Sequence, residues 1–284
     1  MYPPKFDYYR ANSLSEAFSL LQEHSGAKVI AGGHSLLPAL KLRLADPGTL
    51  IDIGRIAELK GITANGSAVR IGALTTHATV AIASNLPKGL TEAASWIGDP
   101  QVRNRGTVGG NIAHADPASD LPTVLTALGA TINLVGPGGE RSVAAQDFFT
   151  GLFETTLQEG ELVSSIDVPT ESAGTGSAYA KLFNPASRYA VVGCAAQVKL
   201  ENGLCSAASI AIGGLTSHAI KAKAVEAALV GMALYEANIA AAAAQIASDI
   251  GDDVMGDMHA SADYRLSIAP IYVARAITAA AARA

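Results

Sequence analysis

Two glycine-rich segments stand out in this 284-residue chain as candidate ligand-binding turns. The first, from Val29 to Leu36, reads VIAGGHSL, and the second, from Gly106 to Asn111, reads GTVGGN. Adjacent glycines let a ligand approach the backbone because no Cβ stands in the way, and the N–H groups at the start of a following helix attract an anion. Two such turns could hold the two phosphates of a pyrophosphate from opposite sides.

Each glycine pair taken alone is more often an ordinary turn, and neither segment has the spacing of a G-x-G-x-x-G or phosphate-loop motif. The surroundings of the second segment favour a functional role. Residues 96–106 and 114–122 are polar, punctuated by glycine and poor in hydrophobic periodicity, which predicts a long loop. Long loops in compact domains usually carry function.

The other reactive side chains indicate no competing chemistry. Cys194 has apolar neighbours, which is typical of an inert packing residue, and with Cys205 alone it supplies neither a disulfide framework nor an iron–sulfur cluster. Asp116 and Asp120 lack further hard ligands nearby in sequence, so we expect no metal pair.

We interpret His34 as a cofactor contact rather than a proton-transfer group. An equally good interpretation is that His34 is a turn residue bonded to the backbone. No Ser-His-Asp or H-E-x-x-H arrangement supports hydrolysis.

Composition excludes several classes of protein. Hydrophobic residues make up 49% of the sequence, which excludes a disordered chain, and 20 basic against 25 acidic residues give a net charge of -5, which disfavours binding to nucleic acid. The chain is charge-poor, with a mean hydropathy of +0.28, yet no apolar run approaches the roughly 18 residues of a membrane span. The N-terminal residues lack the apolar run of a signal peptide. We therefore expect a soluble chain that buries surface against partner subunits.

The elements that would position the first turn alternate between helix and strand. A helix is predicted from Ser13 to His24, a buried strand over 27–31, an apolar segment over 36–44 and a strand over 49–53. The first glycine turn would therefore join a strand to a helix start within one compact α/β unit.

Two further units follow in the sequence. The second begins with a hairpin at Asn65-Gly66 and continues with strands over 131–135 and 161–168 and helices over 75–83, 86–94 and 121–128. The loose stretch 169–176 predicts a boundary, and strands over 177–183, 189–200 and 206–212 precede a helix-rich end. We expect two lobes, 1–58 and 59–175, and a C-terminal domain, 176–284.

Several ordered motifs together resemble a known family. Residues 31–35 (AGGHS), 98–104 (GDPQVRN), 106–111 and 116–122 (DPASDLP) are similar to the FAD-binding medium subunit of the molybdenum hydroxylases, the family of xanthine dehydrogenase and aerobic carbon monoxide dehydrogenase. The resemblance extends over essentially the whole chain, including residues 261–265 (SADYR). It implies an α+β fold with a two-lobed FAD-binding domain of the vanillyl-alcohol-oxidase (PCMH) type. A smaller C-terminal α+β domain with a three-stranded sheet and a helical bundle would follow.

The resemblance also implies a function. The chain would be an FAD-dependent oxidoreductase subunit with no catalytic side chain of its own. Substrate would be oxidised at the molybdenum cofactor of a large subunit, electrons would pass through 2Fe–2S clusters of a small subunit, and FAD in this chain would deliver them to quinone, NAD or oxygen. A carbon monoxide dehydrogenase-like complex is favoured, with an aldehyde, purine or N-heterocycle (nicotine) dehydrogenase as the alternative. We expect a cytoplasmic dimer of heterotrimers, either free or associated with the inner face of the membrane through its acceptor.

The family's cofactor contacts fall on three groups of residues when carried onto this sequence. The pyrophosphate would be wrapped by Val29, Ile30, Ala31, Gly32, Gly33, His34, Ser35 and Leu36 together with Gly106, Thr107, Val108, Gly109, Gly110 and Asn111. Ser119 and Asp120 would contact the adenosine side, and Leu162 would pack by the adenine. Ile97 and Tyr189 would flank the isoalloxazine, and Lys181 would lie near the flavin edge.

Structural alternatives stand beside these assignments. Tyr189 precedes an apolar run and could fill a core, and a lysine at position 181 of a strand pattern is more often solvent-facing. Asp99 and Arg103 could form a weak surface ion pair or could shape the loop over the flavin ring. For the whole chain, the rivals are a flavin-free scaffold subunit and a standalone flavin oxidase. The two intact glycine pairs argue against the first, and the short C-terminal domain argues against the second.

Overall fold

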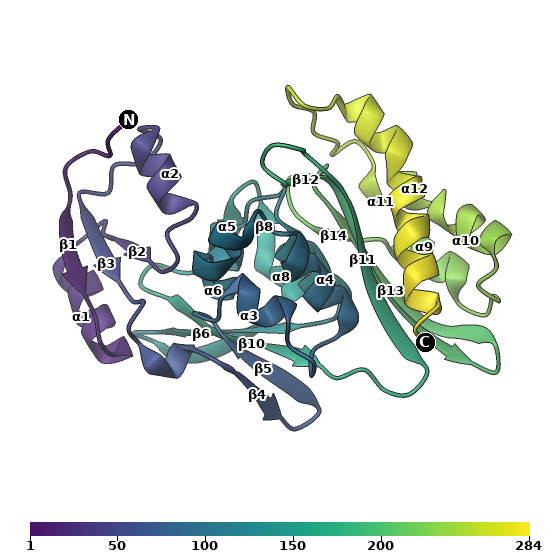
Figure 1. Ribbon diagram of the computed structural model, residues 1–284, viewed down its shortest axis with the longest axis horizontal. Helices are drawn as coiled ribbons and strands as arrows, with labels where there is room; N and C mark the ends of the chain where they lie inside the picture. Colours follow the sequence, from purple (N-terminus) through teal and green to yellow (C-terminus); the bar gives the residue numbers. More distant parts are fainter.

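The N-terminal unit of the computed structural model, which describes residues 1–284, is a small parallel sheet with two helices (Figure 1). Its strands lie in the order β1 (Asp7–Arg10), β3 (Thr49–Asp52) and β2 (Lys28–Ile30), and both pairings are parallel. Helices α1 (Leu14–Glu23) and α2 (Leu36–Lys41) provide the crossovers that parallel strands require. The first glycine turn therefore lies where β2 ends and α2 begins, as the sequence predicts.

A five-stranded antiparallel sheet forms the base of the middle unit (Figure 1). Its order is β4 (Ile62–Asn65), β5 (Ala68–Gly72), β10 (Leu162–Pro169), β6 (Thr131–Gly136) and β7 (Gly139–Ala144). The 3-10 turn η1 (Ala57–Leu59) leads into it from the N-terminal unit. Strands β4 and β5 form the predicted hairpin, in which Gly66 adopts the left-handed conformation, φ +61°, that this turn needs.

Helices cover one face of this sheet (Figure 1). They are α3 (His77–Ala81), α4 (Lys88–Trp96), α5 (Pro100–Arg105), α6 (Val108–His114), α7 (Asp120–Ala127) and α8 (Ala145–Phe148), followed by the small hairpin of β8 (Phe149–Gly151) and β9 (Glu154–Thr155). A core of 28 buried residues lies between the helices and the sheet. The segment expected to be one long polar loop thus contains α5 and α6, which are too short to show a hydrophobic period.

The C-terminal unit is an antiparallel sheet covered on both faces. Its strands are β11 (Thr175–Phe183), β12 (Ala190–Glu201), β13 (Leu204–Gly213) and β14 (Ile220–Lys221), so a two-residue strand extends the three-stranded sheet we expected. Helices α9 (Lys223–Leu229), α10 (Glu236–Ala243), α11 (Ile246–Ile250) and α12 (Ala262–Ala281) pack on one face.

The other face of the C-terminal sheet packs against α4 and α7 of the middle unit. Alternate residues of one strand consequently belong to different cores: Ala195 joins the middle core, whereas Cys194 and Ala196 join the C-terminal core. This explains why the whole of β12 reads as an apolar run rather than an alternating one. No helix of the protein is long and apolar enough to cross a membrane.

Candidate functional site

The first glycine turn presents a row of unused backbone donors. The N–H groups of Gly32, Gly33, His34 and Ser35 donate to no acceptor within the protein. Gly33 has a φ of +74°, and the Nδ1 atom of His34 pairs with the Gly32 carbonyl at 3.1 Å, which holds the turn in shape. Consecutive N–H groups with no partner in a turn of this kind form an anion-binding concavity.

The second turn is a helix start that packs tightly against the protein. Thr107 caps α6, with its Oγ1 accepting from the N–H of Gly110 at 3.3 Å. Gly109 donates its N–H to the Ala73 carbonyl at 2.8 Å, and a Cβ at Gly109 would lie 2.9 Å from the Ala73 Cα. Gly109 therefore serves packing, and Gly110 is the glycine that faces the first turn.

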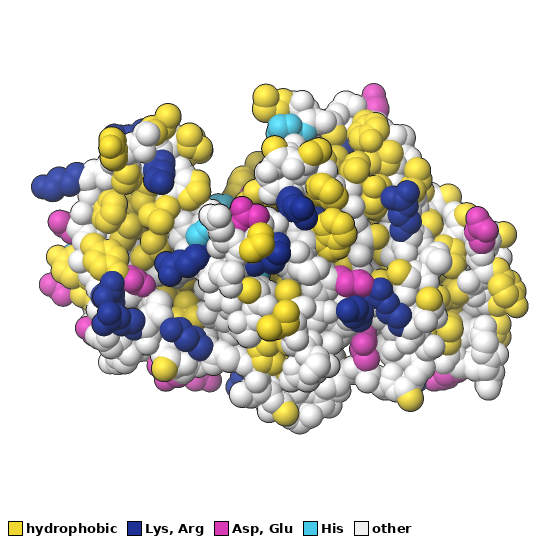
Figure 2. All heavy atoms as spheres, in the orientation of Figure 1, with side chains coloured by type: hydrophobic (Ala, Val, Ile, Leu, Met, Phe, Trp, Pro, Cys, Tyr) yellow, Lys and Arg dark blue, Asp and Glu magenta, His cyan; other side chains and the backbone are white.

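The two turns meet each other in space. A Cβ on Gly32 would lie 2.9 Å from the Gly106 Cα, and a Cβ on Gly110 would lie 3.7 Å from the Ala31 Cβ. Figure 2 shows the surface hollowed between the unit that carries α2 and the part that carries α5 and α6, with basic side chains on both sides of the hollow. A diphosphate fits this arrangement because free N–H groups and bare backbone line the junction of the two turns.

A buried histidine that the sequence did not single out supports this junction. The ring of His77 lies under Gly106, where an added Cβ would come within 2.7 Å of its Cδ2 atom, and the backbone N–H of His77 donates to the Gly106 carbonyl at 3.1 Å. Burial lowers the pKa of His77 to about 4, and His34 and Arg103 add to the shift. Its buried Nδ1 has no hydrogen-bond partner. No motif in the sequence marks this residue, because its role depends on a contact between separate segments.

Asp120 and Lys181 form an ion pair inside the protein. The Lys181 Nζ lies 2.8 Å from Asp120 Oδ2, and the Tyr179 hydroxyl donates to Asp120 Oδ1 at 2.7 Å. Burial raises the pKa of Asp120 and lowers the pKa of Lys181, and the attraction between them opposes both shifts. Lys181 also donates to the carbonyls of Trp96 at 3.2 Å and Arg188 at 2.7 Å. The lysine is therefore buried rather than solvent-facing, and it ties two loops to β11.

The two loops held in this way carry Ile97 and Tyr189. Ile97 is half-buried beside the middle core, and Arg103 donates to the carbonyls of Ile97 and Gly98 at 3.0 Å each. Asp99 instead caps α5 by accepting from the N–H of Val102 at 2.9 Å. Asp99 and Arg103 therefore do not form an ion pair with each other. Both side chains instead bond to the backbone and shape this loop.

Tyr189 reaches from the C-terminal unit toward the first turn. Its side chain is not in a core, since the residue is 42% exposed. Burial of its hydroxyl end and the Asp116 carboxylate raise the pKa of Tyr189, whereas the nearby Ser35 hydroxyl lowers it. An aromatic ring and the glycine turn thus approach each other across the hollow.

The remaining predicted contacts lie at different depths. Ser119 is buried and donates its hydroxyl to the Asn111 side-chain oxygen at 2.7 Å, which joins α6 to the start of α7. Leu162 is buried in the core that the N-terminal unit shares with η1, next to residues such as Leu59 and Leu74.

Cys194, which the sequence predicts to be a packing residue, is a buried free thiol whose pKa is raised by burial.

The fold and the paired turns define a class of flavoprotein. Residues 4–171 match the FAD binding domain in molybdopterin dehydrogenase, and residues 177–280 match the CO dehydrogenase flavoprotein C-terminal domain. The chain therefore belongs to the FAD-binding subunits of the molybdenum hydroxylases, which confirms the predicted family and the α+β fold. It is an FAD-dependent oxidoreductase subunit that transfers electrons within a multi-subunit complex, and FAD is its own cofactor.

Particular relatives are similar along their whole length. The carbon monoxide dehydrogenase medium chain of Hydrogenophaga pseudoflava is 44% identical, with 100% of this chain and 99% of the relative covered. The 6-hydroxypseudooxynicotine dehydrogenase complex subunit alpha of Paenarthrobacter nicotinovorans is 40% identical, with 100% and 97% covered. A solved structure of carbon monoxide dehydrogenase from Hydrogenophaga pseudoflava matches with a TM-score of 0.94 at 45% identity, covering 100% of this chain and 99% of that one.

Proposed function

We propose that this chain works in a complex of the carbon monoxide dehydrogenase type. Electrons released at the molybdenum cofactor of a large subunit would reach it through 2Fe–2S clusters of a small subunit. The full-length identity of 44% to a carbon monoxide dehydrogenase medium chain supports this choice. Bound FAD would supply the reversible electron transfer that no side chain here offers.

The row of free N–H groups from Gly32 to Ser35, placed against the second turn, carries this proposal. We infer that the segments Val29 to Leu36 and Gly106 to Asn111 hold the FAD pyrophosphate from two sides. Backbone donors suit this task because they are fixed in direction before the ligand arrives. The neutral His77 supports the Gly106 turn from beneath and places no extra charge there.

The other predicted contacts complete this proposed site. Ile97 and Tyr189 flank the flavin ring and exclude water from it, and Lys181 with Asp120 fixes the loops that carry them. Ser119 lies on the adenosine side. Asp120, whose carboxylate oxygens are both engaged by Tyr179 and Lys181, contributes there through its place at the start of α7 rather than through a free carboxylate. Leu162 supports the adenine end from the core. We also propose the three units 1–58, 59–175 and 176–284, since each contains its own sheet.

A spectroscopic experiment on the purified complex tests the proposal. We expect one FAD per copy of this chain and bleaching of the flavin band when carbon monoxide is added without oxygen. Bleaching by an aldehyde, a purine or a nicotine-type heterocycle instead would assign the complex to the alternative class; a medium chain of glyceraldehyde dehydrogenase from Sulfolobus acidocaldarius is 39% identical. An isolated chain that stays colourless after FAD is added, or a complex that releases no flavin when denatured, would contradict cofactor binding and favour a scaffold subunit.

The isolated chain separates this function from that of a standalone flavin oxidase. We expect it to oxidise none of these substrates, with or without added FAD, because the site contains no substrate-activating side chain. Turnover by the isolated chain would contradict the proposal. We further propose a cytoplasmic dimer of heterotrimers that passes electrons to quinone, NAD or oxygen, and the mass of the purified complex in solution checks its stoichiometry.

A further inference from the structure

Arg265 is a buried charged side chain in the first turn of α12, in the SADYR segment that the function proposed above leaves unused. It is 4% exposed. Its guanidinium donates to the carbonyls of Val191 at 3.1 Å and Ala260 at 3.4 Å, to the carbonyl of Gly214, and to the Asp257 carboxylate at 2.5 Å. A charge is costly to bury unless it is well bonded, so acceptors on every side of the guanidinium give it a fixed place.

The contact with Val191 falls on an irregularity in β12. The pairing of β11 with β12 changes register between Leu182 and Phe183 and leaves Val191 as an extra residue, a β-bulge. On its other side, β12 pairs with β13 only from Gly193 onward. Bulges bend a strand and redirect the side chains beside them. Arg265 therefore holds β12 at the point where the sheet itself holds it least.

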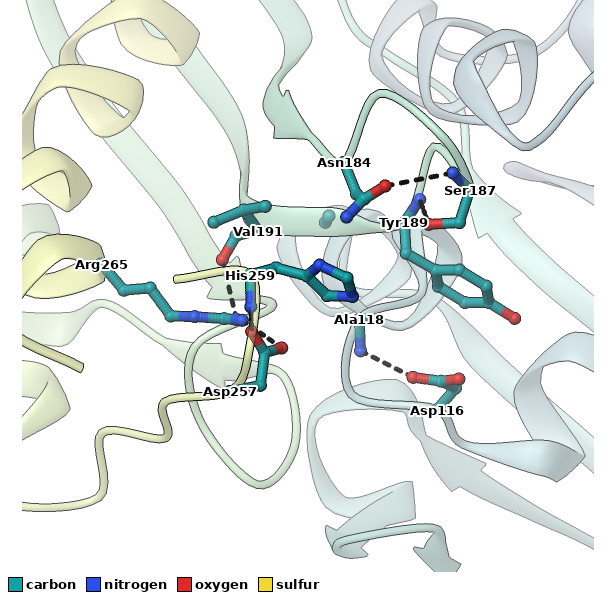
Figure 3. Close-up of a pocket in the computed structure, with 10 residues that line it drawn as sticks. Asp116, Ala118, Asn184, Ser187, Tyr189, Val191, Asp257, His259 and Arg265 are labelled. Carbon is teal, nitrogen blue, oxygen red and sulfur yellow. Dashed lines mark hydrogen bonds and ion pairs between the residues drawn. The ribbon is translucent and has the colours of Figure 1, made fainter. Parts of the chain in front are cut away.

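The bulge lies two residues after Tyr189, whose ring depends on the backbone for its direction. The residue is 42% exposed and borders a cavity of about 210 Å³ that Arg265 and His259 also line (Figure 3). Figure 3 shows the ring pointing away from Val191 and from the guanidinium. Because little packing supports the ring on the side of the cavity, the backbone around residue 189 decides where it points.

Two buried cations hold this backbone from either side of Tyr189. Lys181 of β11 donates to the Arg188 carbonyl at 2.7 Å, one residue before the tyrosine, and Arg265 donates to the Val191 carbonyl, two residues after it. The first of these anchors belongs to the ion pair described above. The second comes from the C-terminal helix, which thereby acts on the flavin cleft without placing a side chain in it.

We propose that Arg265 is a positioning residue for the flavin: by holding the bulge at Val191, it directs the Tyr189 ring onto the isoalloxazine. The proposal rests on the function proposed above and adds to it a residue that touches no cofactor. Asp257 fixes the guanidinium in turn, because its other carboxylate oxygen accepts from two backbone N–H groups of its own turn at 2.8 and 3.1 Å.

Release of FAD from the assembled complex tests this role. Arg265→Lys keeps the positive charge but lacks the fork that bonds two backbone carbonyls and a carboxylate together. We expect FAD to dissociate about tenfold faster from Arg265→Lys and from Tyr189→Ala, the loss of one aromatic contact. The double variant should be no faster than Tyr189→Ala, because the arginine acts through this ring. Fluorescence of free FAD after dilution follows the release.

A spectroscopic signature and two further variants accompany this cycle. The visible circular dichroism of the bound flavin should change in the same direction in both single variants. Asp257→Asn, at a carboxylate that is 49% exposed, loosens the guanidinium without burying an unpaired group and should speed release less than Arg265→Lys does, again only where Tyr189 is present. Arg283→Lys is the matched control, since Arg283 also joins the C-terminal sheet to α4, and it should leave FAD release unchanged.

The outcomes separate this inference from the proposed function. An unaltered complex that contains no FAD would refute the proposed function and this inference with it. If the unaltered complex contains FAD, unchanged release from both Arg265→Lys and Asp257→Asn would overturn the role of Arg265 alone. Losses that add up in the double variant with Tyr189→Ala would overturn it as well, because additive losses are those of a purely structural residue.

Discussion

His77 is a titratable side chain that the fold keeps uncharged next to the proposed phosphate site. Its ring is enclosed between Gly106 and the start of α3, and burial disfavours the imidazolium form. A neutral ring costs less to bury than a charged one and adds no charge of its own beside the backbone donors of the two turns. The residue is therefore best described as a positioning residue beneath the turn.

This setting predicts a pH dependence of stability. Because the pKa of His77 falls from 6.5 unfolded to about 4 folded, the unfolded chain binds the extra proton between these values. The free energy of unfolding should be highest above pH 6.5 and should decrease by up to about 3 kcal/mol as the pH falls toward 4. Denaturant titrations of the purified chain at several pH values measure this.

His77→Gln should flatten the acid side of that profile, since glutamine does not titrate. His218→Gln is the matched control for the substitution itself, at a half-buried ring whose Nδ1 pairs with the Ser217 hydroxyl at 3.1 Å. An identical acid slope in His77→Gln and the unaltered chain would show that other groups cause the loss of stability.

At the level of elements, the start of α6 combines packing and binding in two adjacent glycines. Gly109 touches Ala73 of the middle unit, whereas Gly110 faces Ala31 of the first turn. The sequence shows an undivided glycine pair, and only the neighbours of each residue reveal that the two have different tasks. The Thr107 cap fixes both by setting the first turn of the helix.

Alanine substitutions should separate these tasks. Gly109→Ala should lower the melting temperature of the chain, because its Cβ would lie 2.9 Å from the Ala73 Cα and the backbone cannot yield cheaply. Gly110→Ala meets the Thr107 Oγ1 at 2.8 Å, a side-chain atom, and should cost less stability while reducing FAD content at least tenfold. Thermal unfolding and flavin absorbance give the two readouts. Full FAD content in a folded Gly110→Ala complex would contradict the role of this turn.

At the level of the whole molecule, the buried pair of Lys181 and Asp120 joins the C-terminal sheet to the middle unit. Asp120 begins α7, and Lys181 lies on β11. Removal of one partner leaves an uncompensated buried charge, which typically costs about 3–5 kcal/mol. Lys181 also holds the carbonyls of Trp96 and Arg188, so its loss releases both loops directly, whereas loss of Asp120 acts on them through the lysine, and the effect should spread to the flavin cleft.

A double-mutant cycle measures this coupling. We expect Lys181→Met and Asp120→Asn each to destabilise the chain strongly, and the double variant to be more stable than the sum of the two losses implies. FAD content of the assembled complex should decrease in both single variants. Additive losses would show that the two side chains do not stabilise each other.

Local patterns in the sequence predicted much of the fold. Ser13 caps α1 where expected, and the predicted β4–β5 hairpin forms, with Gly66 and Ser67 as its two loop residues. The strands of the C-terminal sheet lie within two residues of their predicted ranges, and β11 and β13 each start two residues early. These features depend on the chemistry of a few neighbouring residues. The short helices α5 and α6 were not predicted, since their caps at Asp99 and Thr107 act within a single turn that carries no hydrophobic period.

The sequence alone determined the family and the two glycine turns, because motif residues and their order are visible without coordinates. Tertiary structure decided that the turns touch, that Gly109 and Gly110 differ, that His77 supports the junction and that Lys181 is buried against Asp120. It also brought Tyr189 and His259 to one cavity. Each of these contacts joins segments far apart in the chain, and only packing of the three sheets fixes which side chains then meet.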